Sequence, residues 1–110
     1  MDGHWQKVKG CATDIAFGGD ESFFKLGCNE HASGFHIYKW HEPDGWRRFS
    51  QAGGVSLTVD EAGDPWVVNN RKTVFKYDAM DERWLYMGLK NKAEEIAAGA
   101  GSVYAIAGSE

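Results

Sequence analysis

The stretch Trp5-Gln-Lys-Val8 returns as Trp46-Arg-Arg-Phe49 and again as Trp84-Leu-Tyr-Met87, so a Trp-marked unit begins three times in this chain. Each unit goes on with similar segments in the same order. The first follows the Trp by roughly ten residues: Asp14-Ile-Ala-Phe17, Ser56-Leu-Thr-Val59 and Glu95-Ile-Ala-Ala98. The next is rich in aromatic residues: Ser22-Phe-Phe-Lys-Leu26, Asp64-Pro-Trp-Val-Val68 and Ser102-Val-Tyr-Ala-Ile106. Two units then contain Ile37-Tyr-Lys-Trp40 and Val74-Phe-Lys-Tyr77. A period of about 40 residues with four short β-like segments predicts β-propeller blades.

The expected secondary structure is all-β, in antiparallel blades of four strands. We predict strands at residues 5–8, 12–18, 22–27, 34–40, 46–49, 54–59, 65–69, 73–77, 84–87, 94–98 and 102–107. The segment 90–98 has some helical propensity, but its alignment with the two earlier units favours a loop followed by a strand. Gly19-Asp20 and Ala62-Gly63 mark hairpin turns, and Glu42-Pro43-Asp44-Gly45 has the composition of a turn.

The length of 110 residues predicts one domain, residues 1–110. Its repeats span approximately 5–45, 46–83 and an incomplete 84–110. Segment 5–8 is expected to be an outermost strand, so the chain holds about 2.7 blades. An open stack leaves apolar faces and strand edges in water. We therefore expect homo-oligomerisation to close the ring, with a six-bladed dimer as the simplest arrangement.

Aromatic residues at matching positions are the candidate core. Trp5, Trp46 and Trp84 are expected to pack between blades, and Phe24, Trp66 and Tyr104 are expected in the core, because large aromatic side chains dominate protein interiors. Small residues such as Ala16 and Ala97 suit the inner strand of a blade, where neighbouring blades converge.

The chain resembles a tectonin-type repeat, the pattern of tectonin and tachylectin-like lectins. The residues that carry the resemblance are Trp5-Gln-Lys-Val8, Gly10-Cys-Ala-Thr-Asp14-Ile-Ala-Phe-Gly18, Phe35-His-Ile-Tyr-Lys39, Asp64-Pro-Trp-Val-Val-Asn69 and Gly101-Ser-Val-Tyr-Ala-Ile106. The second unit departs from the pattern with Ser56-Leu-Thr, and the third has a shortened hairpin. The resemblance implies a β-propeller, commonly six-bladed. It also implies either a lectin that binds bacterial or modified glycans in innate defence, or an interaction domain of a larger protein.

A sugar site needs an aromatic platform and a few planar polar groups. Trp40 and Tyr77 occupy equivalent positions after two strands, and each precedes a turn that carries an aspartate, Asp44 or Asp81. Asn29 and Asn69 occupy equivalent strand ends. These six residues are the predicted ligand-binding set, and one shallow site per repeat would make glycan binding multivalent. For Trp40 and Tyr77, a purely structural role is equally well supported by the sequence.

Several other functions are not expected. Ser22, Ser50, Ser56 and Ser102 have no nucleophile motif around them, so we expect no catalytic residues and no enzyme. Adjacent carboxylates in a strand point to opposite faces and make no acid–base pair. The net charge of −4 argues against a nucleic-acid partner. The histidines and cysteines lack the spacing of a metal site, and no cofactor is expected.

The N-terminus shows no signal peptide, and no long apolar run predicts a membrane span. The simplest expectation is a cytoplasmic protein, or a secreted one if a leader was removed. A bridge between Cys11 and Cys28 would be diagonal across a hairpin, so in the cytosol free thiols are expected. Two alternatives to a non-catalytic lectin stay open. One is a structural or protein-interaction propeller segment completed by a partner chain, and the other is an engineered or excised propeller fragment.

Overall fold

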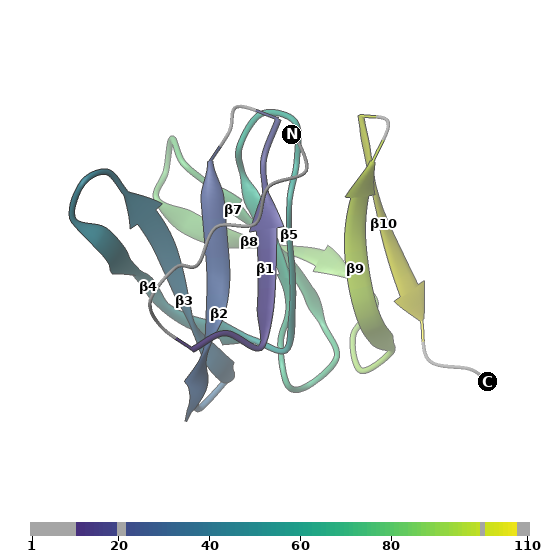
Figure 1. The fold of residues 1–110 in the computed structure, drawn as a ribbon. Coiled ribbons are helices and arrows are strands. Elements are labelled where there is room, and N and C mark those ends of the chain that lie inside the picture. Colours follow the sequence, from purple (N-terminus) through teal and green to yellow (C-terminus); the bar gives the residue numbers. More distant parts are fainter. Residues whose placement is uncertain (1–10, 20–21, 100, 108–110) are drawn as a thin grey trace.

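The structure is a computed structural model that describes residues 11–19, 22–99 and 101–107 (Figure 1). Its strands are β1 Asp14–Phe17, β2 Phe23–His31, β3 Gly34–His41, β4 Gly45–Gly54, β5 Ser56–Val59, β6 Pro65–Val68, β7 Val74–Asp78, β8 Arg83–Gly88, β9 Ala93–Gly99 and β10 Ser102–Ala107. The described part contains no helix, so the all-β prediction is confirmed. Segment 93–99 is a strand in spite of its helical propensity. The predicted strand at 5–8 lies outside the described residues.

The strands form three antiparallel sheets in chain order: β1-β2-β3-β4, β5-β6-β7-β8 and the hairpin β9-β10. Each of the first two sheets thus has the four strands expected of a blade. The registers repeat as well, because Asp14 pairs with Leu26, Ser56 with Val68 and Glu95 with Ile106. Residues that are aligned by the sequence repeat therefore occupy equivalent places in the three sheets. The three sheets of the described residues do not close into a ring.

The first strands of the three sheets lie next to one another (Figure 1). Side-chain acceptors connect them: the Leu57 N–H donates to Asp14 Oδ2 at 3.0 Å, and the Ile96 N–H donates to Ser56 Oγ at 3.1 Å. The two acceptors, Asp14 and Ser56, are equivalent residues of the repeat. The two donors, Leu57 and Ile96, are also equivalent to each other, and each lies one position further along in the next sheet. The same pattern of backbone-to-side-chain hydrogen bonds therefore connects successive sheets.

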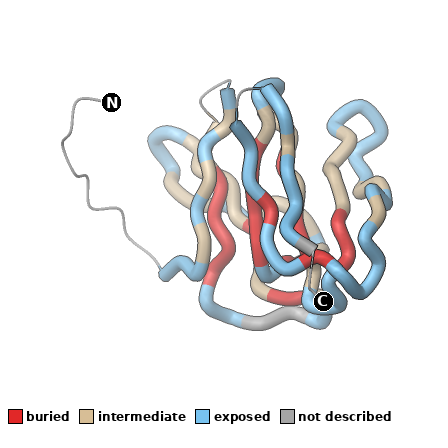
Figure 2. Tube along the Cα trace, turned by 90° about the vertical axis from the view of Figure 1, so that its right-hand side faces the viewer, coloured by how far each residue is buried: buried red, intermediate tan, exposed pale blue. Residues whose placement is uncertain are grey.

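The main core lies between the first two sheets and contains six buried apolar residues: Phe24, Leu26, Ile37, Leu57, Val59 and Val67. Side chains alternate across a strand, so β2 sends Phe24 and Leu26 into this core and Phe23 and Lys25 to the opposite face. A smaller cluster of Val68, Val74, Ala93 and Ile96 attaches the final hairpin. Figure 2 shows the buried stretches gathered in the middle of the molecule, with exposed turns at its ends.

The expectation for the three aligned aromatic residues holds only in part. Phe24 is buried and Trp66 is half-buried, but Tyr104 is 62% exposed. The prediction that Tyr104 lies in the core is wrong for the single chain. Phe24 and Trp66 each face a following sheet, whereas the described residues include no sheet after β10 that could cover Tyr104.

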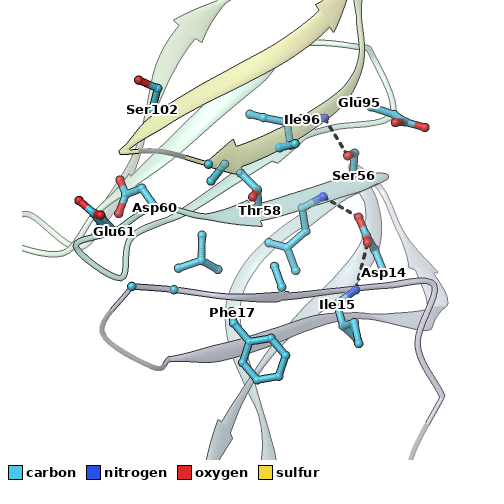
Figure 3. A pocket seen from close by; sticks show the side chains of 18 of the residues that line it. Asp14, Ile15, Phe17, Ser56, Thr58, Asp60, Glu61, Glu95, Ile96 and Ser102 are labelled. Carbon is cyan, nitrogen blue, oxygen red and sulfur yellow. Dashed lines mark hydrogen bonds between the residues drawn. The ribbon is translucent and has the colours of Figure 1, made fainter. Parts of the chain in front are cut away.

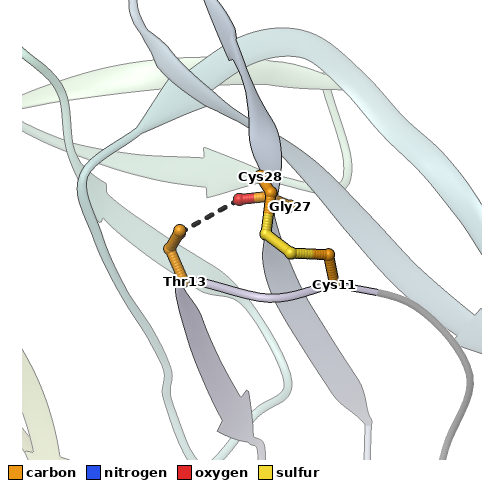
Figure 4. Close-up of a disulfide and its surroundings, with 4 residues drawn as sticks. All are labelled: Cys11, Thr13, Gly27 and Cys28. Carbon is orange, nitrogen blue, oxygen red and sulfur yellow. Dashed lines mark hydrogen bonds between the residues drawn. A yellow bond between two sulfur atoms is a disulfide. The ribbon is translucent and has the colours of Figure 1, made fainter.

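The expectation of free thiols is also wrong, because Cys11 and Cys28 form a disulfide with a Cα–Cα distance of 5.7 Å (Figure 4). Strand β2 runs on to His31, past the end predicted at residue 27, and this carries Cys28 alongside the segment before β1. The Thr13 hydroxyl donates to the Gly27 carbonyl at 3.1 Å, and the Thr13 N–H donates to the Leu26 carbonyl at 2.9 Å. These bonds align the segment before β1 with β2.

The β5–β6 hairpin is organised by the side chain of Asp60. Its Oδ1 accepts the N–H groups of Ala62 (3.1 Å) and Asp64 (2.9 Å), and its Oδ2 accepts the indole N–H of Trp66 (2.9 Å). We expect Asp60→Ala to lower the free energy of unfolding by about 2–3 kcal/mol, because it leaves three donors without their charged acceptor. Urea unfolding measures the loss. Glu61→Ala, next to it and exposed, is the control, and equal losses for both variants would contradict this role of Asp60.

Candidate functional site

The aromatic pair Trp40 and Trp46 stands where β3 ends and β4 begins. The two residues are cross-strand partners, and their rings meet edge to face with centroids 5.2 Å apart and planes at 77°. The turn between them includes Gly45, whose φ of 98° suits a residue without a side chain. Both tryptophans are half-buried. The turn therefore presents a partly exposed aromatic corner that is held in place by the sheet.

Polar groups surround this corner. The Trp40 indole N–H donates to Glu42 Oε2 at 2.6 Å. Asp44 and Arg47 form an ion pair, and their side chains are 55% and 58% exposed. An aromatic face next to a carboxylate and a guanidinium offers both stacking and directional hydrogen bonds to a polar ligand.

The corner continues into an aromatic face on the outer side of the first sheet. Phe17 stacks on Phe23 with ring centroids 4.3 Å apart, and the ring centroids of Phe23 and Trp46 are 4.8 Å apart. Lys25 is buried on the same face, with its Nζ 4.7 Å from the Trp46 ring centroid. Removal from water lowers the pKa of Lys25 below its ordinary value. The outer face of the first sheet is thus apolar and contains the ammonium group of Lys25.

The equivalent pair in the second sheet is Tyr77 and Trp84, with ring centroids 5.2 Å apart. Here the first sheet covers the pair: Phe49 lies 4.7 Å from Tyr77, and the Trp84 indole N–H donates to Ser50 Oγ at 3.2 Å. In the adjoining turn, Asp81 lies 3.8 Å from Arg83. The aromatic-plus-aspartate arrangement therefore occurs twice, but only the Trp40 pair faces outward.

The two predicted asparagines lie at the other ends of the sheets. Asn29 is near the end of β2 and Asn69 directly follows β6, whereas Trp40 and Tyr77 are near the ends of the antiparallel neighbours β3 and β7. Asn69 Oδ1 accepts the N–H groups of Arg71 (3.0 Å) and Thr73 (3.1 Å), so it shapes its turn. Asn69 also borders a small hollow of about 140 Å³ together with Trp84. Asn29 is exposed. The structure thus separates the two asparagines from the aromatic and aspartate residues, which come together once in each of the first two sheets.

A larger hollow of about 740 Å³ lies along the three inner strands β1, β5 and β9, and the sequence did not predict it (Figure 3). Its lining includes Asp14, Ser56 and Glu95, the three equivalent positions that begin the inner segments. The sequence signal that could have indicated the hollow is the small or polar residue at every second position of these segments: Asp14 and Ala16, Ser56 and Thr58, Glu95 and Ala97. Figure 3 shows Ile15 and Phe17 pointing away from the strand that carries Ser56.

The described residues contain no group of three or more His, Cys, Asp or Glu side chains that could hold a metal ion. Within residues 11–19, 22–99 and 101–107 there is also no helix that is long and apolar enough to cross a membrane. No protein-family model matches the sequence, and no curated protein matches it significantly.

Proposed function

We propose that this chain is a tectonin-type propeller segment that binds surface glycans without catalysis. The observation that carries the proposal is an aromatic residue paired across two strands with a Trp, next to an aspartate in the turn before that Trp and an arginine on the Trp's own strand. This arrangement occurs as Trp40–Trp46 with Asp44–Arg47, and as Tyr77–Trp84 with Asp81–Arg83. The arginines are not equivalent in the repeat, because Arg47 follows its Trp and Arg83 precedes it.

Trp40 and its turn are the preferred sugar contact. The apolar C–H face of a pyranose stacks on an indole ring, and the exposed Asp44 and Arg47 side chains can bind its hydroxyl groups. The Tyr77 pair is a weaker candidate in the single chain, because Phe49 packs against Tyr77. Asn29 and Asn69 lie at the other ends of their sheets and are not part of the Trp40 site.

We also propose that the sheets are blades of a propeller that two chains close into a six-bladed ring. Support comes from the chain order of the strands, from the adjacency of β1, β5 and β9, and from a final blade of which the described residues form two strands. A dimer would carry each glycan site twice, so weak sites would gain avidity on a multivalent surface.

The disulfide favours the secreted alternative for localisation. Disulfides persist in oxidising compartments and are rare in the cytosol, where thiols are kept reduced. The pairing of Cys11 with Cys28 therefore supports a protein that works outside the reducing cytoplasm, as a lectin of innate defence would.

Replacing Trp40 by alanine is expected to weaken glycan binding about tenfold to a hundredfold, because a stacking aromatic residue at the centre of a small site dominates its affinity. A glycan array identifies the ligand, and titration of tryptophan fluorescence measures the affinity. Trp40→Phe should keep part of the stacking and lose less.

The matched control is Tyr86→Ala, which removes an exposed aromatic ring from β8. Its glycan affinity should equal that of the unaltered protein. The absence of binding to any glycan on the array would overturn the proposal, and equal effects of Trp40→Ala and Tyr86→Ala would move the site away from Trp40.

A protein-interaction segment is the second candidate. It is favoured by the exposed apolar side chains on the two outermost sheets, Ile15, Phe17, Tyr104 and Ile106. A different chain that completes the ring would cover them. A protein that stays monomeric alone and binds no sugar, but forms a stable complex with one purified partner, would establish this alternative.

A further inference from the structure

The outer face of the first sheet exposes positions that are buried in the second. Ile15 and Phe17 of β1 are 53% and 58% exposed. Their equivalents in β5, Leu57 and Val59, are 3% and 2% exposed, because they face the first sheet. The outer face of β1 and β2 thus has the character of a face that a preceding sheet covers.

The outer face of the final hairpin shows the reverse. Tyr104 and Ile106 of β10 are 62% and 61% exposed, whereas the equivalent residues of the first sheet, Phe24 and Leu26, are 1% and 0% exposed. Phe24 and Leu26 are buried by the sheet that follows them. The hairpin therefore ends in a face that a following sheet covers, and the chain carries two unlike, complementary faces.

In the hydrogen-bond pattern between successive sheets, one acceptor position of the described residues has no following sheet. Asp14 accepts the N–H of Leu57, and Ser56 accepts the N–H of Ile96 (Figure 3). The third acceptor in this series is Glu95, which is exposed at the end of the series. The donor that would complete the series is the N–H of Ile15, which within the chain donates to Oδ1 of the adjacent Asp14 at 3.0 Å.

Charges at these two faces are complementary. Lys25 is the cross-strand partner of Ile15, and the equivalent residue in the second sheet is the apolar Val67, the partner of Leu57. A carboxylate that approaches Ile15 in the way that Asp14 approaches Leu57 comes close to Lys25. Glu95 is one methylene longer than Asp14 and can reach past the backbone to this ammonium group. Burial lowers the pKa of Lys25, and an anion placed beside it would offset that cost.

We propose that the β9–β10 hairpin of one chain docks on the outer face of β1 and β2 of a second copy, with Glu95 directed at the Ile15 N–H and Lys25. The inference rests on the ring closure proposed above and does not depend on glycan binding. Because both faces belong to the same chain, a two-fold axis makes the contact twice and leaves neither face open.

The same contact would bring the inner strands of a second chain to the hollow that β1, β5 and β9 line. The two described strands of the hairpin match β1 and β2 of the first sheet, whereas Trp40 and Trp46 lie on β3 and β4. Trp46 nevertheless borders the contact, because its ring lies against Phe23 and Lys25.

The first test is the mass in solution across a dilution series, measured by light scattering without sugar. We expect a dimer for the unaltered protein. Ile15→Asp and Ile106→Asp, which each place a charge in one face, should raise the dimer dissociation constant by at least about a hundredfold, because every dimer contains the contact twice. Met80→Asp is the control, since Met80 is 95% exposed in the β7–β8 turn, and it should remain dimeric.

Mixing the two altered proteins tests the head-to-tail arrangement. Each keeps the face that the other has lost, so the mixture should form a one-to-one pair although neither protein associates alone. Glu95→Lys, which opposes Lys25 with a like charge, should weaken the dimer about tenfold or more. Circular dichroism verifies that the variants are folded. If they are not, amide hydrogen exchange of the unaltered chain decides, with protection of residues 14–17 and 102–106 expected to rise with concentration.

A monomer at every concentration would overturn the proposal, and so would a dimer that survives both face substitutions. Substituted proteins that stay apart when mixed would overturn it as well. A larger closed ring that responds to the same substitutions would support the contact and change the number of copies. A monomer that still binds glycans would refute this contact while leaving the carbohydrate-binding function intact, so the two proposals fail separately.

Discussion

Replacing Phe24 by alanine is expected to lower the free energy of unfolding by about 3–5 kcal/mol, which is the usual cost of removing a buried Phe ring and leaving a cavity. Phe24 lies between the first two sheets, and its ring meets that of Phe49 edge to face with centroids 5.1 Å apart. Domains of this size unfold with only about 5–15 kcal/mol. Urea unfolding followed by circular dichroism should therefore show a much earlier transition.

The control for this substitution is Tyr86→Ala, because Tyr86 is 60% exposed and lies on β8. Its loss should be about 1 kcal/mol, the size of the exposed edge-to-face contact that its ring makes with Phe75. If Phe24→Ala cost no more than Tyr86→Ala, the two sheets would not share the core described here.

Reduction of the Cys11–Cys28 disulfide is expected to cost about 3 kcal/mol, since the bond closes a loop of 17 residues in the unfolded chain. The bond also ties the segment before β1 to β2. Unfolding curves recorded with and without a reducing agent measure the effect on stability.

A Cys11→Ser and Cys28→Ser double variant is the control for the reducing agent. It should match the reduced protein in stability and should not respond to reductant. An unaltered protein whose unfolding curve does not move upon reduction would argue that the two thiols are not paired in solution.

The repeat made most of the fold predictable from the sequence. Aligning three copies placed Ala93–Gly99 in a strand although its own residues have some helical propensity, and it assigned strands to sheets in the observed order. Local propensity alone does not decide such a segment, because packing against Val68 and Val74 stabilises the strand.

The disulfide and the exposure of Tyr104 could not be predicted from the repeat. Strand β2 continues through a bulge between Leu26 and Glu30, and this extension brings Cys28 next to Cys11. Irregularities of this kind have no clear sequence signal. Tyr104 matches Phe24 in the repeat, but its burial depends on a following sheet, and the described residues contain none after β10.

The candidate site was predictable in one of its pairs but not in its assembly. The strand registers make Trp40 equivalent to Tyr77, as the repeat predicted. The match of Asn29 with Asn69 is wrong, because Leu26 is equivalent to Val68 and Asn69 is therefore equivalent to Gly27. Consecutive antiparallel strands run in opposite directions, so the C-terminal ends of β2 and β3 lie at opposite ends of the sheet and cannot share one site. The direction of each strand, which the succession of hairpins implies, is therefore enough to separate the asparagines from the aromatic residues.

The two unlike exposed faces make each chain a bifunctional building block in the sense of polymer chemistry. Such a unit can add further units end to end or close on itself, and an open series of head-to-tail contacts grows into a filament. Closure is intramolecular, so a fitting geometry gives it a high effective concentration and dilution favours it over growth. A substitution that changes the angle between neighbouring sheets, without harming either face, would therefore turn a ring-forming protein into a fibre-forming one.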